Sequence, residues 1–206
     1  MPADADVAAA FHESSETFVT LVASIDEPQW EEPGTGEWTV LELVAHTMRA
    51  FVAIDEVLVR PLDPASRRLA GAADYYRVAM SMAGVHDGIS ARARDGAALI
   101  KVDPPTKVRV LADRVGQLVD ATPGDREVQH YAGRITFRDY LVTRLTELVL
   151  HCVDIQCALG IEPRAPVRAA ALVRDELLVL AEDADALAVA CALSGRGRFV
   201  ACDVLS

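Results

Sequence analysis

Glu147 and His151 are the residues whose types and spacing could bring a metal ion into this chain. They stand four positions apart in the segment RDYLVTRLTELVLHCVDIQCALG, from Arg138 to Gly160. On an α-helix, side chains four residues apart lie on one face, so this carboxylate and imidazole can reach the same cation. The alternative is a solvated stripe in which the two side chains share a hydrogen bond. The spacing by itself is compatible with both.

The apolar residues around this pair indicate that the helix is buried. They cover most of its circumference and comprise Leu141, Val142, Leu145, Leu148, Val149, Cys152, Val153, Ile155 and Leu159. The remaining arc is polar and carries Tyr140, Thr143, Arg144, Glu147, His151 and Asp154. A helix that is apolar on most sides belongs in the interior of a protein. Its polar stripe is therefore expected to face something inside the molecule.

Two further members of the polar stripe have candidate catalytic roles. Asp154 could accept a hydrogen bond from the His151 imidazole and fix its tautomer, or it could accept a proton. Arg144 lies one turn before Glu147 and could hold a substrate carboxylate. The alternative for Arg144 is a salt bridge to Glu147 or Asp154. Cys152 falls on the apolar side and is interpreted as a small core residue.

The rest of the chain predicts more helices, joined by short connections. Thr39 and Glu42 form a capping box that begins one of them, and Thr106 is expected to cap another. Glycines at 84 and 88 weaken one helix enough for a bend or break. Helices are expected over residues 4–25, 39–60, 72–100, 107–121, 138–160, 166–183 and 185–194, with a β-hairpin as the alternative for the last. The segment around His130 is expected to be a loop.

Composition limits the class of protein and its partners. The 206 residues are 51% hydrophobic with a net charge of −11, which argues against nucleic acid and anionic membrane as partners. No apolar run approaches the roughly 18 residues of a membrane span, and the acidic N-terminus does not look like a signal peptide. A cytoplasmic protein with reduced cysteines is expected. We expect residues 1–160 to form a helical bundle and residues 161–206 to pack on it as part of the same domain.

Two segments resemble a known family. GEWTVLELVAH, from Gly36 to His46, and YLVTRLTELVLHCVD, from Tyr140 to Asp154, are similar to motifs of the mycothiol-dependent maleylpyruvate isomerase family. That family is a branch of the DinB-like metal-binding bundles, and the tail ALSGRG at 192–197 resembles the ending of its short members. Without the resemblance, a single histidine such as His46 on its helix face would more often be a core residue with hydrogen-bonded ring nitrogens than a metal ligand.

The resemblance implies a fold, a metal and a cofactor. The fold is an all-α, DinB-like antiparallel four-helix bundle, here with short additional C-terminal helices. The implied ligands of a divalent metal are His46, Glu147 and His151; the metal is usually zinc, with Ni²⁺ or Fe²⁺ as other candidates. The implied cofactor is mycothiol or a similar thiol. Arg196 would hold an anion if the tail folded over the site, and otherwise it is solvated.

Three functions are compatible with this pattern. The first is a thiol-dependent isomerase or S-transferase acting on a small electrophile. The second is a non-catalytic metal-binding bundle that binds a ligand or partner protein. Isomerising members of the family carry a further C-terminal domain, of which little more than a short tail is expected here, and this favours the second function. Three protein ligands would leave a fourth coordination position open, and this favours the enzyme. The third is a non-haem iron protein, since two histidines and one carboxylate also suit Fe(II). A homodimer is an open alternative to a monomer.

Overall fold

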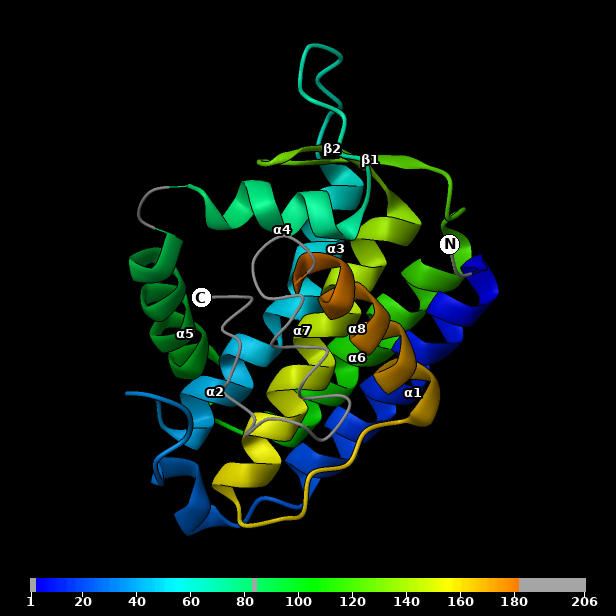
Figure 1. The fold of residues 1–206 in the computed structure, drawn as a ribbon. Coiled ribbons are helices and arrows are strands. Elements are labelled where there is room, and N and C mark those ends of the chain that lie inside the picture. The colour runs from blue at the N-terminus through cyan, green and yellow to red at the C-terminus, as the bar shows by residue number, and fades with distance from the viewer. Residues whose placement is uncertain (1–2, 83–84, 182–206) are drawn as a thin grey trace.

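The computed structural model describes residues 3–82 and 85–181, and most of this length is helical. The helices form a bundle with one short two-stranded hairpin at one end (Figure 1). The prediction of an all-α bundle is therefore confirmed. In chain order the elements are α1 (Asp4–Ala23), η1 (Glu27–Glu31), α2 (Val40–Thr47), α3 (Arg49–Val59), α4 (Ala72–Met80), α5 (Val85–Ile100), α6 (Pro104–Ala121), β1 (Glu127–His130), β2 (Gly133–Thr136), α7 (Phe137–Ala158) and α8 (Val167–Ala181).

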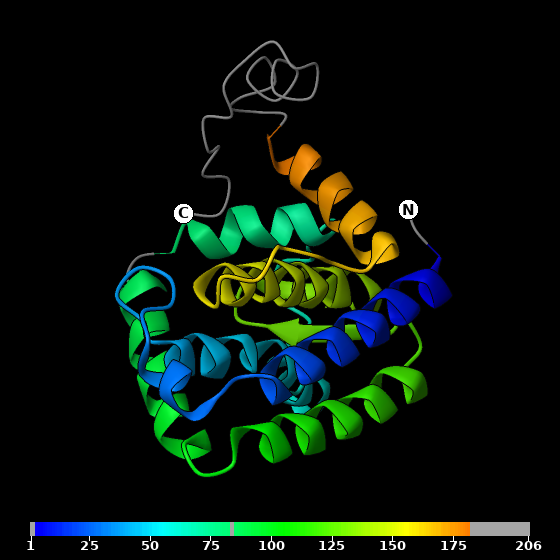
Figure 2. The ribbon, with the colours of Figure 1, turned by 90° about the horizontal axis from the view of Figure 1, so that it is seen from below.

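Helix α7 is the central element of the bundle. It packs against α1, α2, α3, α4 and α8, and Figure 2 shows these helices around it. Thr136 begins α7 by accepting a hydrogen bond from the backbone N–H of Asp139, and Gly160 follows its end at φ +68, where a residue without Cβ is favoured. Because α7 has neighbours on most sides, its apolar residues need to cover most of its circumference, as the sequence indicates.

The expected helix over 39–60 is divided into α2 and α3 at Met48. The predicted capping box is present, with Thr39 and Glu42 each bonded to the other's backbone. The division follows Thr47, whose buried hydroxyl donates to the Leu43 carbonyl at 2.7 Å. Such a bond to the preceding turn bends helices, and here it precedes the point where the helix is interrupted. The expectation of one continuous helix was wrong.

Two other helix boundaries differ from the sequence expectation in detail. The segment 72–100 forms two helices, α4 and α5, in line with the break that glycine allows there. Helix α6 begins at Pro104, and its cap is Asp103 rather than Thr106. The Asp103 carboxylate accepts from the Thr106 backbone N–H at 3.3 Å. Proline suits the first turn because the N–H that it lacks would have no partner there.

The segment around His130 is a β-hairpin and not the loop expected from sequence. Strands β1 and β2 pair antiparallel, with the buried Val128 opposite the buried Ile135. The preceding connection braces β2, because the Leu69 N–H donates to the Arg134 carbonyl at 2.7 Å and the Arg134 N–H donates to the Arg67 carbonyl at 2.7 Å. This pairing fixes His130 at the end of β1, over α4 and α7.

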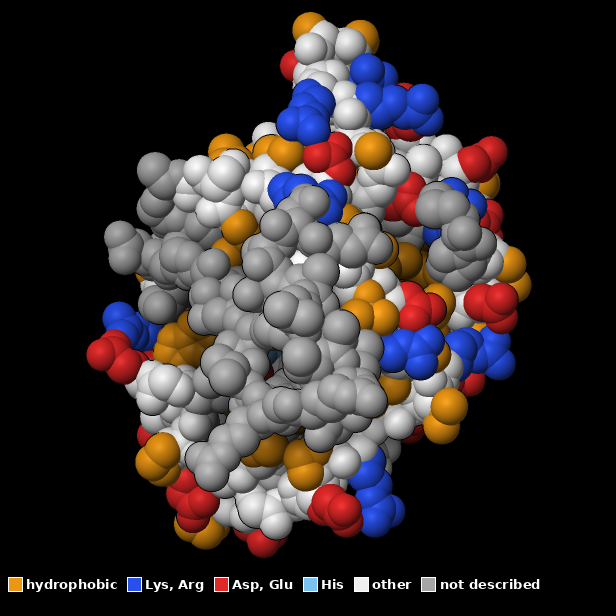
Figure 3. Space-filling view, viewed as in Figure 1, with side chains coloured by type: hydrophobic (Ala, Val, Ile, Leu, Met, Phe, Trp, Pro, Cys, Tyr) orange, Lys and Arg blue, Asp and Glu red, His pale blue; other side chains and the backbone are white. Residues whose placement is uncertain are grey.

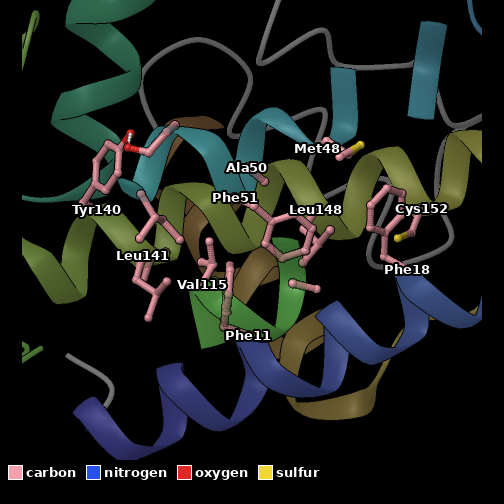
Figure 4. Packing of buried hydrophobic residues seen from close by; sticks show 14 of the residues in the cluster. Phe11, Phe18, Met48, Ala50, Phe51, Val115, Tyr140, Leu141, Leu148 and Cys152 are labelled. Atoms are coloured by element: carbon pink, nitrogen blue, oxygen red, sulfur yellow. Dashed lines mark hydrogen bonds between the residues drawn. The ribbon is translucent and has the colours of Figure 1, made fainter. Parts of the chain in front are cut away.

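Aromatic rings join the outer helices to the centre of the core. Phe11 of α1 and Phe51 of α3 meet edge to face with centroids 5.8 Å apart, and Phe18 lies 6.0 Å from Phe51 (Figure 4). Leu148 of α7 is fully buried in the same cluster. Burying each such side chain stabilises the fold by about 1.5–3 kcal/mol. This packing holds α7 rigidly against the N-terminal half of the chain.

Helix α8 and the surface complete the described part of the molecule. Helix α8 packs on α1, α4 and α7. The expected helix or hairpin at 185–194 lies outside the described residues. Acidic and basic side chains are interspersed over the described part of the face in Figure 3, and ion pairs such as Arg138 with Asp4 link separate elements. Among the described helices, none has both the length and the apolar character that a bilayer span requires.

Candidate metal centre

His46, Glu147 and His151 converge at the contact between α2 and α7. One ligand atom from each lies within 4.8 Å of the other two. His46 comes from the last turn of α2, and the capping box at the start of that helix sets its position along the bundle. The Trp38 ring system packs against the His46 imidazole at a tilt of 43°, with centroids 4.7 Å apart. The imidazoles of His46 and His151 meet edge to face at 4.7 Å.

The spacing within this group fits a small divalent cation. His151 Nε2 and Glu147 Oε2 are 3.4 Å apart. Ligands bound tetrahedrally to zinc at 2.0–2.1 Å are about 3.3 Å from each other, so this pair already has the required separation. The chemistry also fits, because two imidazole nitrogens and one carboxylate oxygen form a common catalytic zinc set. Among the described residues, this is the one group of three such side chains close enough to share an ion.

The atoms of the pair that face away from the centre have their own partners. His151 Nδ1 is 2.9 Å from Asp154 Oδ2, so the carboxylate holds the imidazole with Nε2 toward the other two ligands. The Tyr76 hydroxyl lies 3.1 Å from Glu147 Oε1, which leaves Oε2 facing His151. The site therefore has an outer layer of hydrogen bonds that orients two of the three donor groups.

The electrostatics keep two of the three groups in the form that binds metal. Burial and the nearby His151 lower the pKa of His46 to about 4, so it is neutral at pH 7. Burial alone would raise the pKa of Glu147, but the hydrogen bond to His151 and the charge of Arg144 outweigh it and lower the pKa to about 2. For His151, burial is outweighed by Asp154 and Glu147, which raise its pKa to about 9. A bound cation would take the place of that proton.

A cavity of about 470 Å³ reaches the metal centre from one side. Two candidate metal ligands, His46 and Glu147, line the cavity. Its wall also includes Tyr75, Arg144 and His130. Two of the three candidate ligands are therefore accessible to a small molecule in the cavity. This arrangement matches a catalytic metal site, in which one coordination position stays open, better than a closed structural site.

Arg144 makes neither of the salt bridges considered from sequence. Within the described residues it has no carboxylate within 4.0 Å. Its Nε donates to Thr143 Oγ1 at 3.0 Å and its Nη2 donates to the Tyr75 hydroxyl at 3.1 Å. The guanidinium also lies over the rings of Tyr75 and Tyr140, at 5.5 and 5.1 Å from their centroids. Arg144 is thus a buried cation beside a cavity, held by neutral groups.

Two contributors to the cavity wall, His130 and Tyr76, were not assigned to the site from sequence, although the segment around His130 could have approached it. His130 contacts the ring of Tyr75 at 4.8 Å, and its Nδ1 accepts from the Ala132 N–H at 3.3 Å. Burial, helped by the charge of Arg144, lowers the pKa of His130 to about 3. Tyr76 of α4 also lines the cavity, and its spacing in the sequence indicates only a helix. The alternation of buried and half-buried residues after the turn, in β2, was the available signal for the hairpin and so for His130.

The other candidate residues are placed as follows. Asp154 lies beside His151 as described above. Cys152 is buried in the core, and burial raises the pKa of its thiol to about 12, as expected for an inert thiol. Cys157 is an exposed free thiol. Arg196 lies outside the described residues.

The fold and this site define a class of protein: helical bundles in which histidine and carboxylate side chains of two helices converge and could hold a metal ion. Residues 11–156 match the mycothiol maleylpyruvate isomerase N-terminal domain family. The chain belongs to this family and has its DinB-like, all-α fold. Searches of curated proteins and of solved structures found no match.

Proposed function

We propose that this protein uses a divalent metal and a small thiol of the mycothiol type to modify a small electrophile. The reaction is an isomerisation, if the thiol adds and is later eliminated, or an S-transfer, if it stays attached. The observation that carries this proposal is the pairing of a three-residue ligand set with a cavity that reaches two of its members. Membership of the family supports the choice of thiol.

The metal would be held by His46, Glu147 and His151, and zinc is the candidate that best suits two imidazoles and one carboxylate. When bound, it would supply an open position at which a thiol loses its proton and becomes a strong nucleophile at neutral pH. Asp154 would hold the His151 imidazole in the tautomer that exposes Nε2, as its 2.9 Å contact with Nδ1 indicates.

Arg144 indicates that the electrophilic substrate is negatively charged. A buried cation without a carboxylate partner is costly, so an anion arriving from the cavity would stabilise it. Arg60 and Arg92 line the same cavity, and within the described residues neither has a carboxylate within 4.0 Å. The substrate we propose is therefore an anion, with its acidic group on Arg144 and its electrophilic carbon toward the metal centre. Arg196 remains a second candidate anion ligand.

The first test is metal analysis of protein purified without added metal, followed by turnover assays with thiol and anionic electrophiles. We expect about one divalent ion per chain, turnover that requires thiol, and loss of both ion and turnover in Glu147→Gln. Iron in place of zinc would favour the oxygen-dependent chemistry of two-histidine, one-carboxylate iron proteins.

The same assay separates catalysis from simple binding. A protein that binds metal and thiol but turns over no electrophile, across a panel that varies the leaving group and the double bond, would support the non-catalytic bundle. Absence of bound metal in the wild-type protein would overturn the proposal.

A further inference from the structure

Tyr76 is a buried tyrosine beside the candidate metal centre. It belongs to α4 and is 4% exposed. Its hydroxyl lies 3.1 Å from Glu147 Oε1 and 3.0 Å from the backbone carbonyl oxygen of Thr143. The preceding residue, Tyr75, has a different partner, because its hydroxyl accepts a hydrogen bond from Arg144. Two adjacent tyrosines of one helix thus contact two different groups in the cavity wall, Glu147 in the case of Tyr76 and Arg144 in the case of Tyr75.

The two carboxylate oxygens of Glu147 have different surroundings. Oε1 faces the Tyr76 hydroxyl, whereas Oε2 faces His151 Nε2 at 3.4 Å. A carboxylate can bind a cation through one oxygen or through both. Because the terminal torsion of a glutamate side chain is soft, the side chain alone does not select between the two modes. A hydrogen-bond donor on one oxygen favours binding through the other, since it occupies a lone pair and draws charge that a second metal bond would use.

We propose that Tyr76 is a positioning residue that restricts Glu147 to binding the metal through one oxygen. The consequence is an open coordination position on the side of the cavity, which Tyr76, Glu147 and His46 line together. If both oxygens bound, the second would occupy space needed by a thiol or substrate. This inference rests on the proposed metal centre and adds what keeps that centre open.

The test compares Tyr76→Phe with Tyr75→Phe, each of which removes one hydroxyl and keeps the ring. Both variants are loaded with cobalt(II), whose visible absorption weakens as its coordination number rises. For Tyr76→Phe we expect about tenfold weaker metal binding, the size typical of losing an outer hydrogen bond to a ligand, together with weaker absorption. Tyr75→Phe should match the wild type in metal affinity and in spectrum. A Tyr76→Phe protein that matches the wild type in both would overturn the inference while leaving the metal centre intact.

A second measurement needs no variant at position 76. The infrared difference spectrum of metal-loaded minus metal-free wild-type protein reports the separation between the two carboxylate stretching bands, which is wider when one oxygen binds. Loss of these bands in Glu147→Gln assigns them. A wide separation supports one-oxygen binding, and a narrow one overturns it. Failure of the wild type to bind any divalent ion would overturn this inference and the proposed function together.

Discussion

The two ends of the cavity are built for opposite charges. At one end, His46, Glu147 and His151 present nitrogen and oxygen atoms to a common point, and the carboxylate carries negative charge. At the other end, Arg144 is held by hydroxyls and aromatic rings, with no carboxylate within 4.0 Å among the described residues. Both charges come from a single turn of α7. One turn of a helix can therefore present a cation site and an anion site, because different residues surround its acidic and its basic side chain.

The largest expected effect is at the cation end. Glu147→Gln keeps the size of the side chain but removes the charged donor and should weaken zinc binding at least about a hundredfold, more than the loss of an outer-layer residue. Competition with a chromophoric chelator measures this affinity. Arg144→Met serves as the matched control from the same helix turn and should bind zinc far more tightly than Glu147→Gln, because it keeps all three candidate ligands. Equal zinc affinity in the two variants would mean that Glu147 is no more important for zinc binding than Arg144 is.

At the anion end, Arg144→Met should have two effects of opposite sign. It should weaken binding of an anionic ligand by about tenfold or more, because charge-assisted hydrogen bonds are lost. In the ligand-free protein it should leave the free energy of unfolding unchanged or raise it, since a buried charge with no carboxylate within 4.0 Å is replaced by an apolar chain. Chemical denaturation with and without the anion distinguishes the two effects. A loss of about 3 kcal/mol in the ligand-free state would instead indicate an internal salt bridge.

A smaller effect is expected from the layer that orients the ligands. Asp154→Asn should reduce zinc affinity by about tenfold, because the amide orients His151 less firmly than the carboxylate does. Isothermal titration of the metal-free protein measures this. The exposed pair Arg174 and Asp175 offers a control, since Asp175→Asn removes an equal charge from α8. If the two variants lose affinity equally, Asp154 acts only through net charge.

The smallest effect concerns the pH dependence of stability near the anion end. The folded protein keeps His130 neutral down to about pH 3, whereas the unfolded chain protonates it near 6.5. The unfolded state therefore binds more protons between these values, and stability falls as pH falls below about 6.5. The slope for one such group approaches about 1.4 kcal/mol per pH unit. His130→Gln should show a shallower slope in urea unfolding measured from pH 7 to pH 4.5, and parallel curves would contradict the burial of a neutral imidazole.

The sequence was most informative where a pattern is local. The spacing of Glu147, His151 and Asp154 places three side chains on consecutive turns of one helix, and the apolar circumference of α7 indicates a central position. The capping box at Thr39 is local in the same way, since its two hydrogen bonds join residues only three positions apart. These features follow from helix geometry alone and could be predicted without the fold.

Features that depend on contacts between distant segments could not be predicted in this way. The place of His46 beside His151 was implied only by resemblance, because no local rule joins positions 46 and 151. The partner of Arg144 is Tyr75 of another helix, so helical spacing suggested the wrong partners, Glu147 and Asp154. His130 became part of the cavity wall through a hairpin that is braced by a connection about 65 residues earlier in the chain.

The most direct test of the whole account is metal-edge X-ray absorption on the zinc-loaded protein, before and after addition of mycothiol. Three protein ligands from two helices should give a first shell of nitrogen and oxygen only, and the thiol should then add one sulfur at about 2.3 Å. A shell that already contains sulfur before the thiol is added, or that gains none afterwards, would contradict an open three-residue metal centre.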